Sequence, residues 1–186
     1  MRIIAGKFRG KKIKFINSSI TRPLRDVVRE NIFNLINYSN NINVKLEMSN
    51  VLDLYAGIGS FGIECISRNV KKVVFVERNE IAHSILKENI SSLNLKNNTK
   101  LIFSDVSFFL KSYRDTLKFD IIFFDPPYND NTYIDNIKII KNLNIIKQNH
   151  LIIVHRDKQT KEDLKDFLNV LFVKKYGRSQ ITFGYF

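Results

Sequence analysis

The chain has 186 residues, 21.8 kDa of mass, 44% hydrophobic and 26% charged residues, a content that allows one domain with a substantial core and at most a small appendage. No apolar stretch approaches the roughly 20 residues of a membrane span, no signal sequence follows Met1, and the single cysteine, Cys65, excludes an internal disulfide, so we expect a soluble cytoplasmic protein. Residues 1–30 hold +7 of the net charge of +12 (nine basic minus two acidic), and residues 170–186 hold +3 (three basic, no acidic), a polarised excess that is typical of contact with nucleic-acid phosphates.

The first 45 residues predict a small basic appendage. Residues 2–15 contain two short apolar runs around a turn region from Gly6 to Gly10, which predicts a β-hairpin. Pro23 then precedes a helical pattern from about Leu24 to Tyr38. The polar, Asn-rich stretch that follows is typical of a joint, so we divide the chain into residues 1–45 and residues 46–186.

From residue 50 onward, short apolar runs alternate with amphipathic segments. This alternation predicts an α/β fold of the Rossmann-like kind, with a mostly parallel sheet covered on both faces. Two final apolar runs, 171–176 and 180–186, predict a hairpin that ends the sheet with an antiparallel strand. The expected strands are 50–54, 72–76, 100–103, 119–124 and 151–155, and the expected helices are 60–69, 80–93, 106–112, 133–142 and 160–168.

A glycine-rich loop follows the first core strand and opens the next helix. Gly57, Gly59 and Gly62 spell G-x-G-x-x-G, in which glycines allow close approach of a ligand and the helix N-terminus favours anionic groups. The same pattern occurs in nicotinamide dehydrogenases. Against that reading, Asp53 at the strand end would repel a pyrophosphate, yet it could hold the ammonium of a methionine moiety. Too little chain also remains for a second substrate domain.

Acidic residues follow the next strands in the same way. Glu77 ends the second predicted strand, where a carboxylate can bind two ribose hydroxyls, as it also does in NAD sites. Asp105 follows the third, where it could accept an adenine amino group or cap the next helix. Because ligands of open parallel sheets bind at the carboxyl ends of the strands, we expect one cofactor pocket there. Its expected residues are Asp53, Tyr55, Gly57, Gly59, Glu77, Arg78, Asp105 and Asp125.

Asp125-Pro126-Pro127-Tyr128 follows the strand 119–124. Two prolines fix their own φ angles and favour an extended preceding residue, so this loop is stiff and its carbonyls point in defined directions. The Asp125 carboxylate and the Pro126 carbonyl could accept both hydrogens of an NH2 group, while Tyr128 could stack on the base that carries it. A rigid turn without chemical function is the alternative. We take Asp125, Pro126 and Tyr128 as the candidate catalytic residues.

These motifs together resemble the class I S-adenosylmethionine-dependent methyltransferases that methylate amino groups. More narrowly, residues 2–10, Arg22-Pro23 and residues 52–68 resemble the bacterial 16S rRNA guanine-N2 methyltransferases of the RsmD type, and the resemblance covers essentially the whole chain. The chain departs from that family at Leu24 and Arg25, where a hydroxyl residue is common, and at Ile58, where a small residue is common.

The resemblance implies methyl transfer from S-adenosylmethionine, without a metal, to the exocyclic N2 of a guanine in 16S rRNA. It suggests a small ribosomal subunit particle as the substrate and a monomeric enzyme. The residues expected to contact RNA are Lys7, Arg9, Lys11, Lys12, Arg22, Pro127 and Tyr128.

Other functions share some of these residues. A DNA adenine or cytosine amino-methyltransferase would use the same loop, but no insert is large enough to read a duplex groove. A protein-glutamine methyltransferase would be expected to carry Asn in place of Asp125. A non-catalytic RNA-binding assembly factor with a vestigial cofactor site is a third alternative. The three histidines show no metal-ligand spacing, and we interpret His155 and Arg156 as a solvated strand end rather than a substrate contact.

Overall fold

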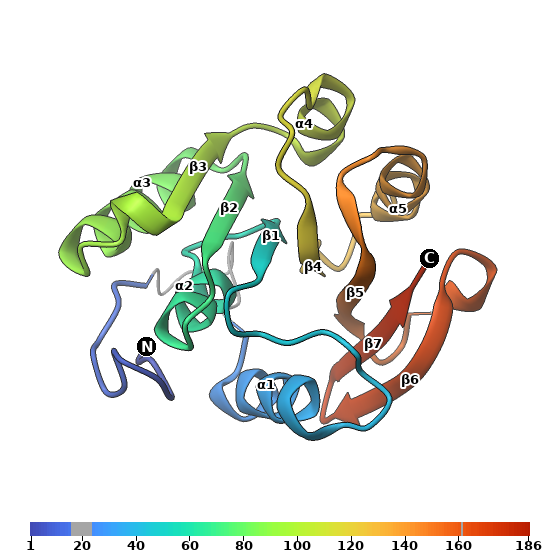
Figure 1. Cartoon of the computed structure of the whole chain (residues 1–186), viewed down its shortest axis with the longest axis horizontal. Helices are drawn as coiled ribbons and strands as arrows, with labels where there is room; N and C mark the ends of the chain where they lie inside the picture. Colours follow the sequence, from blue (N-terminus) through green and yellow to red (C-terminus); the bar gives the residue numbers. More distant parts are fainter. Residues whose placement is uncertain (16–23, 161) are drawn as a thin grey trace.

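A seven-stranded sheet in the order β3-β2-β1-β4-β5-β7-β6 forms the centre of the molecule in the part of the chain that the structure describes (Figure 1). The structure is a computed structural model and describes residues 1–15, 24–160 and 162–186. The first five strands in this order are parallel, whereas β7 runs antiparallel to both β5 and β6. The strands are β1 (Asn50–Leu54), β2 (Lys72–Glu77), β3 (Thr99–Phe103), β4 (Phe119–Phe124), β5 (Ile146–Asp157), β6 (Asn169–Tyr176) and β7 (Ser179–Tyr185).

Helices cover both faces of the sheet (Figure 1). Successive residues of a strand point to opposite faces, and Val51 of β1 joins one apolar cluster while Leu52 joins the other. The Val51 cluster takes its helical residues from α1 (Asp26–Tyr38), α2 (Ser60–Ser67) and α3 (Glu80–Ser92). The Leu52 cluster takes them from α4 (Val106–Ser112) and α5 (Tyr133–Asn142). The continuous apolar runs of the parallel strands therefore reflect burial on both sides.

Most predicted elements form where the sequence indicates, and one does not. The strands 50–54 and 119–124 and the helices 106–112 and 133–142 have the predicted bounds. The helix predicted at 160–168 is wrong: among the described residues of this segment, only a 3-10 turn forms, at Leu164–Asp166. The Asp163 side chain accepts the N–H of Lys165 at 3.0 Å, and this local bond starts a short turn in place of a longer helix.

The N-terminal hairpin forms with very short pairing. Arg2 and Lys12 make an isolated antiparallel bridge, and Ile3 N–H donates to the Lys11 carbonyl at 2.9 Å. The following helix, α1, begins at Asp26 rather than at Leu24. Arg22 and Pro23 lie outside the described residues.

Buried charges attach this segment to the sheet domain. The Glu64 carboxylate of α2 is 1% exposed and accepts the backbone N–H groups of Ile4 and Ala5 at 2.8 and 2.9 Å. Arg29 of α1, also 1% exposed, lies 3.8 Å from Glu64 and donates to the Arg2 carbonyl at 2.7 Å. The segment therefore shares the core of the sheet domain, and the division at residue 45 stays a prediction.

None of the helices among the described residues is both long and apolar enough to span a membrane.

Candidate active site

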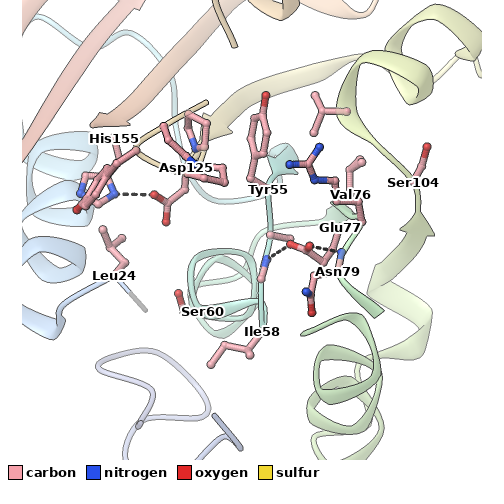
Figure 2. Close-up of a pocket in the computed structure, with 18 of the residues that line it drawn as sticks. Leu24, Tyr55, Ile58, Ser60, Val76, Glu77, Asn79, Ser104, Asp125 and His155 are labelled. Atoms are coloured by element: carbon pink, nitrogen blue, oxygen red, sulfur yellow. Dashed lines mark hydrogen bonds and ion pairs between the residues drawn. The ribbon is translucent and has the colours of Figure 1, made fainter. Parts of the chain in front are cut away.

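A pocket of about 620 Å³ opens at the carboxyl ends of the parallel strands (Figure 2). This volume lies within the roughly 300–1,000 Å³ of small-molecule sites. Eight of the predicted site residues line the pocket: Tyr55, Gly57, Glu77, Arg78, Asp125, Pro126, Pro127 and Tyr128. Lining residues that the sequence did not single out include Asn79, Ser104, Val106, Asn129 and Arg178, and Leu24, noted only as a departure from the family pattern, also lines the pocket.

The glycine loop forms one wall of the pocket. Gly57 and Gly59 have φ angles of +56° and +85°, in the left-handed region that favours glycine. A Cβ at Gly59 would collide with Leu86 of α3, so this position is closed by packing. A Cβ at Gly57 would meet no described atom within 4 Å, because it would project into open space. Gly57 therefore leaves room for a ligand, whereas Gly59 allows α3 to pack against the loop.

Glu77, at the end of β2, is held beside this loop. Its carboxylate is buried and accepts the backbone N–H groups of Gly57 at 2.7 Å and Asn79 at 2.6 Å (Figure 2). Each carboxylate oxygen retains further acceptor capacity. The pair of backbone bonds thus orients an acceptor that could bind two ribose hydroxyls.

Tyr55 reaches the pocket from a strained backbone position with a φ of +61°. Its hydroxyl accepts a hydrogen bond of 2.9 Å from the Asn136 side chain of α5. Burial raises the pKa of the Tyr55 phenol, so the ring is a neutral part of the wall.

Asp53 and Gly59 lie behind the wall rather than in it. Asp53 is 1% exposed, and its carboxylate accepts the N–H of Gly62 at 3.0 Å. Burial raises the pKa of Asp53 well above 3.8, and the nearby Asp125 and Glu77 carboxylates act in the same direction. A contact between Asp53 and a methionine ammonium stays a prediction.

Asp105 also lies outside the pocket wall, although its neighbours Ser104 and Val106 line it. Its carboxylate caps α4 by accepting the N–H groups of Ser107 and Phe108 at 2.9 and 3.3 Å and pairs with Arg78 at 3.2 Å. The capping alternative is therefore observed, while the adenine contact stays a prediction.

The Asp125 loop forms the opposite wall. Asp125 Oδ1 lies 2.7 Å from His155 Nδ1, the only hydrogen bond that the described residues make to this carboxylate (Figure 2). Tyr128 is 39% exposed, and its ring meets the His155 ring edge-on at a centroid distance of 6.3 Å. An acceptor and an aromatic surface thus lie together, as the target-base prediction requires.

Arg156 holds the backbone of this loop through hydrogen bonds. Its guanidinium donates to the carbonyls of Pro127 at 2.7 Å, Tyr128 at 3.0 Å and Pro126 at 3.3 Å. It also lies over the ring of Tyr133 at 4.5 Å. The Pro127 carbonyl also accepts the backbone N–H of Asp130 at 2.9 Å, so Arg156 and this bond together fix the direction of the loop carbonyls.

The interpretation of His155 and Arg156 as a solvated strand end is wrong, since they are 5% and 4% exposed. The reason is that β5 continues to Asp157, where it pairs with β7: His155 lies opposite Ile181, and Arg156 opposite Gln180. One signal in the sequence could have revealed this role. His155 and Arg156 are two hydrogen-bond donors at the end of a strand, and they follow a loop whose proline carbonyls can accept hydrogen bonds.

The basic N-terminal residues Lys7, Arg9, Lys11 and Lys12 are exposed but do not line the pocket. The backbone N–H of Lys7 donates to the carbonyl of Ser67, the last residue of α2, whereas Ser60, the first, lines the pocket. At 1.5 Å per residue, this places the hairpin roughly 10 Å from the pocket along α2. Two exposed cations line the pocket: Arg78, which pairs with Asp105, and Arg178, in the turn between β6 and β7, which pairs with Asp157 at 3.3 Å.

Among the described residues, no group of three or more His, Cys, Asp or Glu side chains could hold a metal ion.

The strand order, the glycine loop after β1, the carboxylate that ends β2 and the Asp-Pro-Pro-Tyr loop after β4 define a Rossmann-like class I methyltransferase. A putative methyltransferase from Escherichia coli has the same fold, with a TM-score of 0.82, 23% identity, and coverage of 98% of this chain and 96% of that one. The chain belongs to the family described as conserved hypothetical protein 95, which matches residues 1–185.

A sequence comparison and a structure comparison with Haemophilus influenzae agree with this placement. The chain is 36% identical to its "Ribosomal RNA small subunit methyltransferase D" over 160 residues, which cover 85% of this chain and 79% of that protein. The crystal structure of a putative methylase from the same organism superposes with a TM-score of 0.77 and 31% identity, over 98% of this chain and 96% of that one. The resemblance to RsmD-type enzymes is confirmed.

Proposed function

We propose that this protein transfers the methyl group of S-adenosylmethionine to the exocyclic N2 of a guanine in 16S rRNA. The observation that carries the proposal is that the Asp125 carboxylate, held by His155, and the carbonyls of Pro126 and Pro127, held by Arg156, belong to one loop at one end of the pocket. The other end combines the open space at Gly57 with the oriented Glu77 carboxylate. One end suits an amino group and the other suits a nucleoside.

The residues of the cofactor end fit S-adenosylmethionine. Glu77 would accept the ribose hydroxyls, and the loop at Gly57 would lie against the methionine moiety, where a side chain would obstruct it. Ser104 and Val106, which line the pocket after β3, would contact the adenine. Bound in this way, S-adenosylmethionine supplies an electrophilic methyl group on its sulfonium.

The target end would act on the nitrogen by orienting it. The exocyclic nitrogen of guanine is a poor nucleophile because its lone pair is delocalised into the ring. Asp125 and the Pro126 carbonyl would accept its two hydrogens, which favours a pyramidal nitrogen with its lone pair toward the methyl group. Alignment of two reactants can contribute roughly 7–11 kcal/mol to lowering the barrier. Asp125 would then receive the proton that the methylated nitrogen loses, or pass it to water, and Tyr128 would stack on the exposed base.

The distribution of charge supports RNA as the substrate. Four exposed cations of the N-terminal hairpin lie at the far end of α2, and Arg178 lies at the pocket itself. One strand of RNA with its target base in the pocket would reach both groups. The relative from Haemophilus influenzae is named as a small-subunit rRNA methyltransferase, which supports a small ribosomal subunit particle as the substrate. We expect a monomer that acts in the cytoplasm.

The test is incubation of the purified protein with labelled S-adenosylmethionine and small ribosomal subunits that lack the modification, followed by nucleoside analysis. We expect label in N2-methylguanosine. The Asp125→Ala variant should still bind cofactor in calorimetry and give no product. Unchanged turnover of this variant would refute the role of Asp125. Label found instead in DNA or in a protein glutamine would overturn the substrate, and absent cofactor binding would favour a non-catalytic assembly factor.

A further inference from the structure

His155 lies between Asp125 and Ser179 in a short chain of hydrogen bonds. Its Nδ1 is 2.7 Å from Asp125 Oδ1, and its Nε2 is 2.9 Å from Ser179 Oγ. The His155 side chain is 6% exposed, whereas that of Asp125 is 25% exposed and faces the pocket. The contact joins two residues 30 positions apart in the sequence, and Figure 2 shows the His155 ring pointing at the Asp125 carboxylate.

Chemistry decides the direction of each hydrogen bond. An ionised carboxylate can only accept, so His155 Nδ1 must carry the hydrogen that lies toward Asp125. In the neutral imidazole, Nε2 then accepts, and Ser179 Oγ–H is its donor. The order is therefore Ser179 to His155 to Asp125.

We infer that His155 is a positioning residue, which occupies Asp125 Oδ1 and so presents Oδ2 to the amino group of the target base, with Ser179 holding the other ring nitrogen of His155. The inference rests on the proposed function. A carboxylate on a partly exposed loop otherwise has two broad rotational minima about its terminal bond. Because displacement by about 1 Å can reduce a rate about 100-fold, one fixed oxygen is a large advantage.

Few groups face His155 and could change the protonation state of its ring. From the loop after β4, it faces the carboxylate of Asp125 and the ring of Tyr128. From β7 and the turn before it, it faces the hydroxyl of Ser179, and the guanidinium of Arg178 lines the same pocket. Asp125 is thus the charged group in contact with His155 among the described residues.

The experiment measures the single-turnover rate of N2 methylation at saturating cofactor and RNA. His155→Ala should lower this rate about 10- to 100-fold, with the cofactor Kd and the RNA KM within twofold of the wild type. His155→Asn should recover most of the rate, because its amide N–H can replace the Nδ1–H. His150→Ala is the matched control: His150 lies on the same strand and contacts the Phe186 N–H, away from the pocket, so this variant should keep the wild-type rate.

Ser179→Ala gives a second reading that does not depend on the folding of His155→Ala. Without the hydroxyl donor, a proton on Nε2 is less disfavoured, so the His155–Asp125 pair takes up a proton more readily. The acid limb of the rate against pH should therefore move to higher pH. A purely structural role would leave that limb in place.

Two outcomes would overturn the inference while leaving the proposed function intact. One is N2-methylguanosine from the wild type together with a His155→Ala rate within twofold of it. The other is a His155→Asn rate as low as that of His155→Ala, with an unmoved acid limb in Ser179→Ala. If the wild type itself makes no N2-methylguanosine, the proposed function fails and the inference fails with it.

Discussion

The Asn89 side chain of α3 makes hydrogen bonds to both the backbone N–H and the backbone carbonyl of Lys14. Its Oδ1 accepts the Lys14 N–H at 2.7 Å, and its Nδ2 donates to the Lys14 carbonyl at 3.0 Å. The same Nδ2 donates to the Ile58 carbonyl of the glycine loop at 3.2 Å. Asn89 is 1% exposed, so one buried amide joins the basic N-terminal segment to the candidate cofactor loop.

The Asn89→Ala variant should therefore lose stability and cofactor affinity together. Unsatisfied backbone groups at Lys14 and Ile58 are expected to reduce the free energy of unfolding by about 1–3 kcal/mol. The glycine loop would also lose its support at Ile58, which weakens cofactor binding. Urea unfolding and calorimetry measure the two effects. An unchanged cofactor Kd in a destabilised variant would show that Asn89 supports only the N-terminal segment.

Gly57→Val should abolish cofactor binding while the protein still folds. Gly57 and Gly10 both have positive φ angles, +56° and +84°, and a Cβ at either one would meet nothing within 4 Å. Backbone strain from valine should thus cost both variants a similar amount, about 1–2 kcal/mol. Gly57 lines the pocket, whereas Gly10 does not. Calorimetry should show lost affinity in Gly57→Val and normal affinity in Gly10→Val, and equal affinities would refute the proposed role of the loop.

Asp53→Asn should stabilise the protein at neutral pH and weaken cofactor binding. Burial raises the pKa of Asp53 above the 3.8 of an ordinary aspartate, so its ionisation opposes folding. This penalty is absent below pH 3.8, grows as the pH rises toward the folded-state pKa, and is complete above it. Asparagine removes the penalty and can still accept the Gly62 N–H. Thermal unfolding should show a gain at pH 7 that shrinks toward pH 4. An undiminished cofactor affinity would argue against the contact with the methionine ammonium.

Replacing Lys7, Arg9, Lys11 and Lys12 by Ala should weaken RNA binding without changing cofactor affinity. Each exposed cation that contacts a phosphate releases counterions, so the slope of log K against log salt should decrease by up to about 3 for four contacts on a single strand. Binding titrations over a range of salt concentrations measure this slope. Alanine at Lys138 and Lys141 of α5, away from the hairpin and the pocket, is the control. An unaltered slope in the fourfold variant would place the RNA elsewhere.

The sequence by itself determined the features that arise from local stereochemistry and from the alternation of apolar residues. The bounds of β1, β4, α4 and α5 follow from apolar runs and periodic patterns. The shape of the glycine loop follows from left-handed φ angles at Gly57 and Gly59, and the stiffness of the Asp125 loop follows from the two prolines. Because the carboxyl ends of parallel strands meet at one edge, these local features also predicted a common pocket for Glu77 and Asp125.

Only the tertiary structure decided which side chains support those loops. The partners are distant in the chain: Asp125 and His155 are 30 residues apart, and Lys14 and Asn89 are 75 apart. Their pairing depends on the length of β5, on its antiparallel neighbour β7 and on the packing of α3, none of which a local pattern specifies. For the same reason, the sequence alone suggested that His155 and Arg156 form a solvated strand end. In the fold, they are buried because β7 pairs with this part of β5.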